Sequence, residues 1–215
     1  MRNLLRHELK LVAHPTNWIF LALSTMLLIP NYPYYVVFFY GCLGFLFTFT
    51  DARENQDLLF LSLLPLGKQD LVKSRFLLVI LFQLGQMLAA VPFAILRQSF
   101  AIPGNAAGMD AGIALFGLAL PMLGIFNRLF LGSFFRRPDK VGTAFLKGCA
   151  GLTVYMVLAE SAAFMVPFFR DCLDTPDPEH LGAKLAVLVI GAVLYVVLNV
   201  LAYRSCAKTF ERVDL

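Results

Sequence analysis

Residues 51–76, DARENQDLLFLSLLPLGKQDLVKSRF, form the longest polar interruption in an otherwise apolar chain. Leucines recur on both sides of Pro65-Leu66-Gly67, a break that a helix does not cross. The pattern predicts two short amphipathic helices that lie along a membrane face and present an apolar surface to a partner. The alternative is an interfacial helix whose apolar side contacts only lipid. Charges of both signs are mixed within the stretch: Arg53, Lys68, Lys73 and Arg75 beside Asp51, Glu54, Asp57 and Asp70.

The composition around this stretch is typical of a membrane protein. The 215 residues are 59% hydrophobic and 15% charged, whereas a soluble domain has about 45–50% apolar and about 25% charged residues. The apolar residues form long runs, and no polar segment is long enough to fold separately. Residues 1–215 are therefore expected to form a single transmembrane domain. The net charge of +4 then reports membrane topology and does not indicate nucleic-acid binding.

The apolar runs predict six transmembrane helices in an all-α fold. Two spans, 18–29 and 34–50, flank the turn signal at 30–33, and both are short against the roughly 20 residues that cross a bilayer. A re-entrant hairpin over 16–50 is the alternative. Residues 1–14 are expected to form a basic amphipathic helix in the membrane interface. The later spans are expected at 76–96, 111–134, 145–168 and 183–203.

Lysine and arginine residues predict which side of the membrane each loop faces. Arg97, Arg170 and Lys184 fall on one side, and the other 15 of the 18 basic residues fall on the opposite side. Basic residues concentrate in cytoplasmic loops. Both termini and a coupling region at 51–75 are therefore predicted to be cytoplasmic.

Signatures of catalysis are scarce. The sequence has no GxxxxGK[ST] phosphate loop, no HExxH and no His/Cys set at metal-ligand spacing. The cysteines contain no CxxC pair, which argues against a disulfide framework: Cys42, Cys149, Cys172 and Cys206. We therefore expect no catalytic residue, metal or cofactor on this chain.

A few polar residues interrupt the predicted spans. A carboxylate at Glu160 is costly in a membrane unless it faces a polar interior or a partner such as Arg97, or hydrates at the interface. Gln83 and Gln86 share a helix face because they are three residues apart. Such residues line a transport path or join helices by hydrogen bonds, and we favour the second role for most of them. The transport-path candidates are Glu160, Gln83, Gln86, Asn127, Tyr155 and Asn199.

At residues 51–76 the sequence resembles the membrane subunits of ATP-binding-cassette transporters of the type-2 permease class. It is most similar to small bacterial permeases typified by the exporters of phenol-soluble modulins. An acidic segment with Asn55 precedes Leu64-Pro65, Lys68, the pair Leu71-Val72 and the triplet Ser74-Arg75-Phe76. The chain departs from the family pattern at Leu63, where Ser is common, and at Phe76, where Tyr is common.

The resemblance implies a permease subunit of the bacterial cytoplasmic membrane that works with a separate ATPase subunit. ATP and Mg would bind the ATPase, and two permeases, identical or related, would build the path. The short predicted outer loops favour export of an amphipathic peptide, an antimicrobial compound or a lipid-like molecule. The residues implied to contact the ATPase are Asp51, Asn55, Leu64, Pro65, Leu66, Lys68, Leu71, Val72 and Arg75.

Two other functions stay open at the level of sequence. Asp51, Glu54 and Asp57 are spaced three apart, so a metal-dependent lipid-modifying enzyme of the membrane is one alternative. The other is a membrane partner without transport activity, such as an immunity or sensor subunit.

Overall fold

The computed structural model describes residues 8–63, 67–100, 105 and 107–212, and within them it contains helices and no strand. Long helices of 20 or more residues make up most of the molecule: α3 (Tyr35–Glu54), α5 (Lys68–Ser99), α6 (Ile113–Phe134), α7 (Val141–Met165) and α8 (Leu181–Phe210). The short helices are η1 (Glu8–Val12), α2 (Thr16–Ala22), η2 (Leu23–Leu28), α4 (Asp57–Ser62) and η3 (Phe169–Leu173).

Five of these helices, namely α3, α5, α6, α7 and α8, are long and apolar enough to cross a membrane. They correspond to the last five of the six predicted spans. The remaining one, at 18–29, lies in the shorter apolar helix Thr16–Leu28. Its α-helical and 3-10 parts together rise roughly 22 Å, which is less than the ~30 Å of a hydrocarbon core. A sixth full span therefore stays a prediction.

The segment after Gly67 differs from the sequence-based expectation. Two short helices were expected on either side of the break at 65–67, but only α4 is short. The residues that follow Gly67 are the first turns of the 32-residue helix α5. No Gly or Pro occurs between Lys68 and the predicted start of the span at Phe76, so nothing in the backbone chemistry interrupts the helix there.

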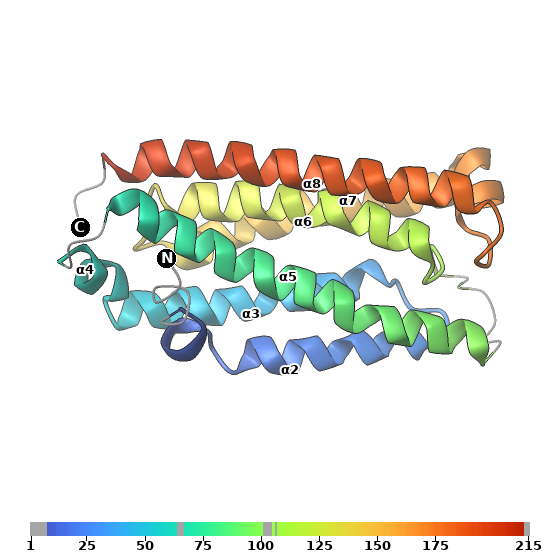
Figure 1. Cartoon of the computed structure of the whole chain (residues 1–215), viewed down its shortest axis with the longest axis horizontal. Coiled ribbons are helices and arrows are strands. Elements are labelled where there is room, and N and C mark those ends of the chain that lie inside the picture. Colours follow the sequence, from blue (N-terminus) through green and yellow to red (C-terminus); the bar gives the residue numbers. More distant parts are fainter. Residues whose placement is uncertain (1–7, 64–66, 101–104, 106, 213–215) are drawn as a thin grey trace.

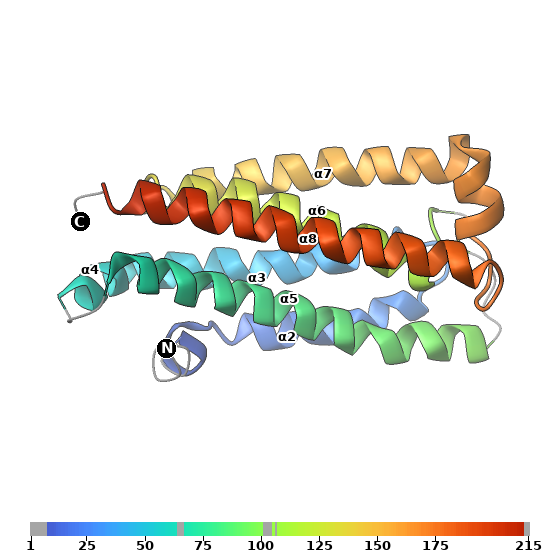
Figure 2. The same cartoon turned by 45° about the horizontal axis from the view of Figure 1, so that its top comes forward.

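The helices form two groups that are seen side by side in Figure 2. One group holds α2, η2, α3 and α5, and the other holds α6, α7 and α8. The most extensive contact between elements joins α6 to α8. Gly191 permits this approach, because a Cβ atom there would lie only 1.9 Å from the carbonyl oxygen of Gly117.

Closely packed phenylalanine rings fill the contact between the two groups. Phe49 of α3 meets the rings of Phe130 and Phe134 of α6 edge-on, with ring centroids 4.9 and 4.7 Å apart. Phe126 and Phe145 extend the cluster toward α7, and all five side chains are buried. Edge-to-face packing of this kind stabilises a core beyond the area that it buries.

The two ends of the bundle carry different charges. The basic end holds η1, α4, residues 135–140 and the last turns of α8 (Figure 1). The acidic end holds residues 107–112 and 170–180. The fold thus gathers the described basic loops at one end, as the sequence predicts. That this end faces the cytoplasm stays a prediction.

Candidate functional site

The helix α4 presents an apolar face at the basic end. The chain turns sharply before it, at Gln56, whose φ of 50° is left-handed. The helix then buries Leu58 and Leu61 against the bundle. Leu59, Phe60 and Leu63 are 40%, 56% and 78% exposed. Large apolar side chains exposed outside the spanning helices are typical of a surface that binds another protein or a membrane.

Arg75 links α4 to the rest of the bundle. Its guanidinium is 1% exposed, pairs with the Glu8 carboxylate at 2.9 Å and donates a hydrogen bond to Asp57. The Ser74 hydroxyl donates to the same Glu8 carboxylate at 2.9 Å. Arg75 also lies 5.9 Å from the centre of the Phe49 ring, a cation–π distance. One side chain of α5 therefore holds η1, α3 and α4 together.

The residues implied to contact an ATPase fall into a surface group and a buried group. Asn55 is exposed, and the Asp51 carboxylate is half-exposed, 3.6 Å from the His14 ring. Lys68 is half-buried and donates to the Glu211 backbone carbonyl at 3.4 Å. The buried group is Leu71, Val72 and Arg75. Leu64, Pro65 and Leu66 lie outside the described residues.

The sequence predicted an apolar surface in this stretch, but Leu59, Phe60 and Leu63 were not among the residues implied to contact the ATPase. Leu59 and Leu63 are four residues apart and so share one face of a helix, with Phe60 beside them. This spacing could have identified the face. A cleft of about 200 Å³ adjoins it, between α4 and the connection from α6 to α7, and is lined by Arg53, Gln56, Leu59, Phe134 and Pro138 among others.

The polar residues in the middle of the bundle bond to one another. The Gln83 and Asn127 amides exchange two hydrogen bonds of 2.8 Å. Asn127 also donates to Asn199 at 2.9 Å, and the Tyr195 hydroxyl donates to Gln83 at 2.8 Å. The four side chains are buried and join α5, α6 and α8. Their geometry agrees with the helix-joining role that the sequence analysis favours, while a part in a transport path stays a prediction.

The other path candidates bond to backbone groups of neighbouring helices or loops. Gln86 donates to the Val37 carbonyl at 2.7 Å, and Tyr155 donates to the Leu118 carbonyl at 2.8 Å. Near the acidic end, a Glu160 carboxylate oxygen accepts the Met109 backbone N–H at 3.0 Å. Arg97, suggested as a partner of Glu160, forms an ion pair with Asp110 at 3.0 Å.

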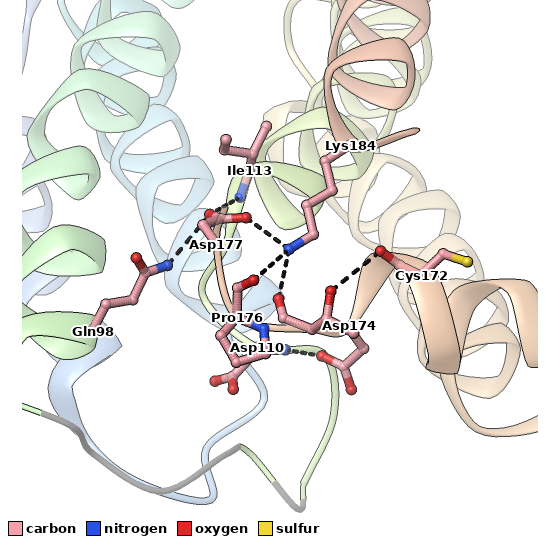
Figure 3. Close-up of polar contacts among 9 residues, drawn as sticks. Gln98, Asp110, Ile113, Cys172, Asp174, Pro176, Asp177 and Lys184 are labelled. Carbon is pink, nitrogen blue, oxygen red and sulfur yellow. Dashed lines mark hydrogen bonds and ion pairs between the residues drawn. The ribbon is translucent and has the colours of Figure 1, made fainter. Parts of the chain in front are cut away.

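A cluster of carboxylates at the acidic end is organised around Lys184, whose side chain is completely buried (Figure 3). Its ammonium group donates to Asp177 at 2.7 Å and to the carbonyl oxygens of Thr175 and Pro176. The other Asp177 oxygen accepts the backbone N–H of Ile113 at 3.1 Å. The cluster thus fastens the loop before α8 to the start of α6. The spacing of these residues in the sequence does not predict this cluster.

Asp174 belongs to the same end of the bundle. One of its carboxylate oxygens accepts the Asp110 backbone N–H at 2.7 Å. Burial raises the pKa of Asp174, and this effect outweighs the lowering by that N–H group and by the Lys184 charge. Ionisation of Asp174 in the folded protein therefore costs free energy.

The acidic residues at 51–57 do not converge. Asp57 bonds to Arg75, and Asp51 lies beside His14. Among the residues that the structure describes, no group of three His, Cys, Asp or Glu side chains is arranged to hold a metal ion.

Comparison with protein families places the chain in a transporter family. The sequence model of a family described as "ABC-2 family transporter protein" matches residues 3–211. No curated protein and no solved structure matches the chain. The matched region covers nearly the whole chain and includes α4, the Arg75 cluster and all five spanning helices.

Proposed function

The chain belongs to the ABC-2 family of transporter proteins, and we propose on that premise that it is the permease of an exporter driven by a separate ATPase at α4. Membership makes it a multi-pass membrane subunit of an ABC transporter. The observation that carries the proposal is the exposed face of Leu59, Phe60 and Leu63 on a helix that Arg75 fastens to α5.

Force applied to α4 would reach the membrane through Arg75. Its bonds to Asp57 and Glu8 connect α4 and η1 to the first turns of α5, a continuous helix of 32 residues. A helix is stiff along its axis, so movement at Lys68 would be carried into the bundle. ATP-driven closure of the ATPase would then favour one of two packings of the helices. ATP and Mg would bind the ATPase chain.

The direction of transport and the class of substrate are the second part of the proposal. The connection between α7 and α8 at the acidic end, residues 166–180, is too short to form a separate domain. This suits release from the membrane better than capture from a soluble binding protein. We propose export of an amphipathic peptide, an antimicrobial compound or a lipid-like molecule across the bacterial cytoplasmic membrane. Two permease copies, or one copy and a relative, would enclose the path, as in the small permeases that the sequence resembles.

Co-purification tests the docking surface. The chain is co-expressed with candidate ABC ATPase subunits, and the complex is isolated through a tag on the permease. We expect an ATPase to co-purify with the unaltered chain and to be lost with Phe60→Asp and Leu63→Asp. Both side chains are exposed, so the substitutions leave the bundle core intact.

Phe168→Asp is the matched control, because Phe168 is 51% exposed at the acidic end. It is expected to leave the complex unchanged. Recovery of the ATPase with both α4 variants, or failure of every candidate ATPase to bind the unaltered chain, would overturn the proposal.

A further inference from the structure

A cleft of about 660 Å³ separates the two groups of helices toward the acidic end. The second half of α5 forms one wall through Leu88, Val91 and Ile95, and the start of α6 forms the other through Ile113, Phe116 and Leu120. Its volume lies within the roughly 300–1,000 Å³ of ligand-binding cavities in proteins. Its lining is almost wholly apolar. The cleft therefore differs in chemistry from the hydrogen-bonded amide network in the middle of the bundle.

The path of α5 produces this cleft. The helix starts beside α8 at the basic end and runs obliquely across the bundle, away from α8 (Figure 1). At the same time the glycines of α6 and α8 hold those two helices in close contact. The space between α5 and the α6–α8 pair therefore widens toward the acidic end.

The polar end of the cleft needs no ionic ligand. Asp177 closes that end, and its carboxylate receives Lys184, the Ile113 N–H and the Gln98 amide, the last at 3.3 Å (Figure 3). The Lys184 cation balances the carboxylate charge. The cleft thus has long apolar walls and a polar end without net charge, which lies at the acidic end of the bundle.

The cleft opens on the exposed side of α5, a helix that is apolar enough to cross a membrane. Leu88, Val91 and Ile95 line it and are also 73%, 40% and 59% exposed. An empty apolar space of this size would forfeit dispersion contacts along its walls, and water finds almost no hydrogen-bond partner on them. A hydrocarbon chain can enter from the side without leaving an apolar environment.

We propose that this cleft binds one acyl chain of a bilayer lipid, with the polar part of the lipid at the level of Gln98 and Asp177. The site lies within a single permease chain. Lipid binding in this cleft does not depend on what the protein transports or on the ATPase. A negative result for lipid binding would therefore leave the proposed function untouched.

Quenching of tryptophan fluorescence by brominated lipid tests the site. Trp18 is the single tryptophan of the chain, so Trp18→Phe gives a background without tryptophan. Three variants then carry one reporter each: Phe116→Trp in the cleft, Phe126→Trp in the buried core and Val193→Trp on the exposed side of α8. Each purified protein is reconstituted in vesicles of dioleoyl-phosphatidylcholine or of its dibrominated form.

We expect bromine to quench the Phe116→Trp reporter nearly as strongly as the Val193→Trp reporter and much more than the Phe126→Trp reporter. Adding Ala94→Phe, which fills the cleft from α5, is expected to remove most of that extra quenching. The matched substitution Ala150→Phe on the exposed side of α7 is expected to leave it unchanged.

Two results would overturn the proposal that the cleft binds an acyl chain. One is quenching of Phe116→Trp that does not exceed that of Phe126→Trp. The other is strong quenching that Ala94→Phe does not lower, because the bromine would then lie in the surrounding lipid. If Ala94→Phe does not reconstitute as a monodisperse protein, Val91→Phe fills the same cleft from a 40% exposed position and decides the question in the same way.

Discussion

Arg75 joins three elements at the basic end of the bundle, η1, α3 and α4, to α5. Arg75→Met keeps much of the side-chain volume but leaves the fully buried Glu8 carboxylate without its guanidinium. Removing one partner of a buried ion pair costs about 3–5 kcal/mol. We expect a clear fall in the thermal unfolding temperature of the detergent-solubilised protein.

Lys73→Met is the matched control for Arg75→Met, because Lys73 is an exposed cation two residues earlier in the same helix. Its effect is expected to stay within about 0.5 kcal/mol, as for most surface substitutions. Equal unfolding temperatures for the two variants would show that the Arg75 cluster does not hold this end together.

Asp174 gives a prediction about pH. Its pKa is raised in the fold, chiefly by burial, so the folded state favours the protonated carboxyl. That preference adds stability below the ordinary pKa of 3.8 and is lost as pH rises through the higher folded value. Asp174→Asn keeps an oxygen for the Asp110 N–H and removes the charge. We expect it to unfold at a higher temperature than the unaltered protein at pH 7.5, with a difference that shrinks toward pH 4.

Asp171→Asn supplies the contrast in the same loop. Asp171 is exposed, and its hydrogen bond with Arg170 lowers its pKa. Its removal is therefore not expected to raise the unfolding temperature at pH 7.5. A pH profile for Asp174→Asn that runs parallel to that of the unaltered protein would contradict the assignment.

At the scale of elements, the amide network decides how α5, α6 and α8 are held together. Asn127→Leu removes the shared partner of Gln83 and Asn199. Hydrogen bonds between membrane helices average about 0.6 kcal/mol each, so we expect a total cost of about 1–2 kcal/mol. The unfolding temperature in detergent measures it, with Thr153→Val on the exposed side of α7 as a neutral control.

Transport assays separate the two roles considered for this network. A helix-joining role predicts that transport falls in Asn127→Leu only in step with stability. Loss of transport in a variant as stable as the unaltered protein would instead place Asn127 in the path.

At the scale of the whole molecule, the prediction concerns which way the bundle faces. We expect the basic end in the cytoplasm. A background with the four cysteines replaced by alanine carries either Arg137→Cys at the basic end or Glu179→Cys at the acidic end. A maleimide that does not cross membranes should label intact cells only at position 179, and should label position 137 after lysis. The reverse pattern would contradict the orientation.

The spanning helices were predictable because their signal is local. An apolar run of about 20 residues needs no knowledge of its neighbours. The spans predicted at 111–134 and 183–203 lie close to Ile113–Phe134 and Leu181–Phe210. The residues before the span predicted at 76–96 were assigned to a separate short helix, whereas they are the first turns of α5. These turns contain four charged residues: Lys68, Asp70, Lys73 and Arg75. Hydropathy does not reveal that some of these charges are neutralised by tertiary contacts.

The candidate site was only partly predictable for the same reason. The motif around residues 51–76 identified the region, but the contacts on which its proposed mechanical role rests join distant parts of the chain. Arg75, for example, contacts Glu8, 67 residues earlier in the chain. The contact between Asp177 and Ile113 at the acidic end is likewise distant in sequence. Such pairings depend on how helices pack, which the spacing of residues along the chain does not encode.

The central claim is that an ATP-hydrolysing subunit binds α4, and site-specific cross-linking in cells tests this claim most directly. A photoreactive phenylalanine analogue replaces Phe60 on α4 or, as the control, Phe168 at the acidic end; both side chains are more than half exposed. We predict that light links position 60, and not position 168, to an ABC ATPase subunit. A cross-link to the ATPase from position 168 with none from position 60 would contradict the account.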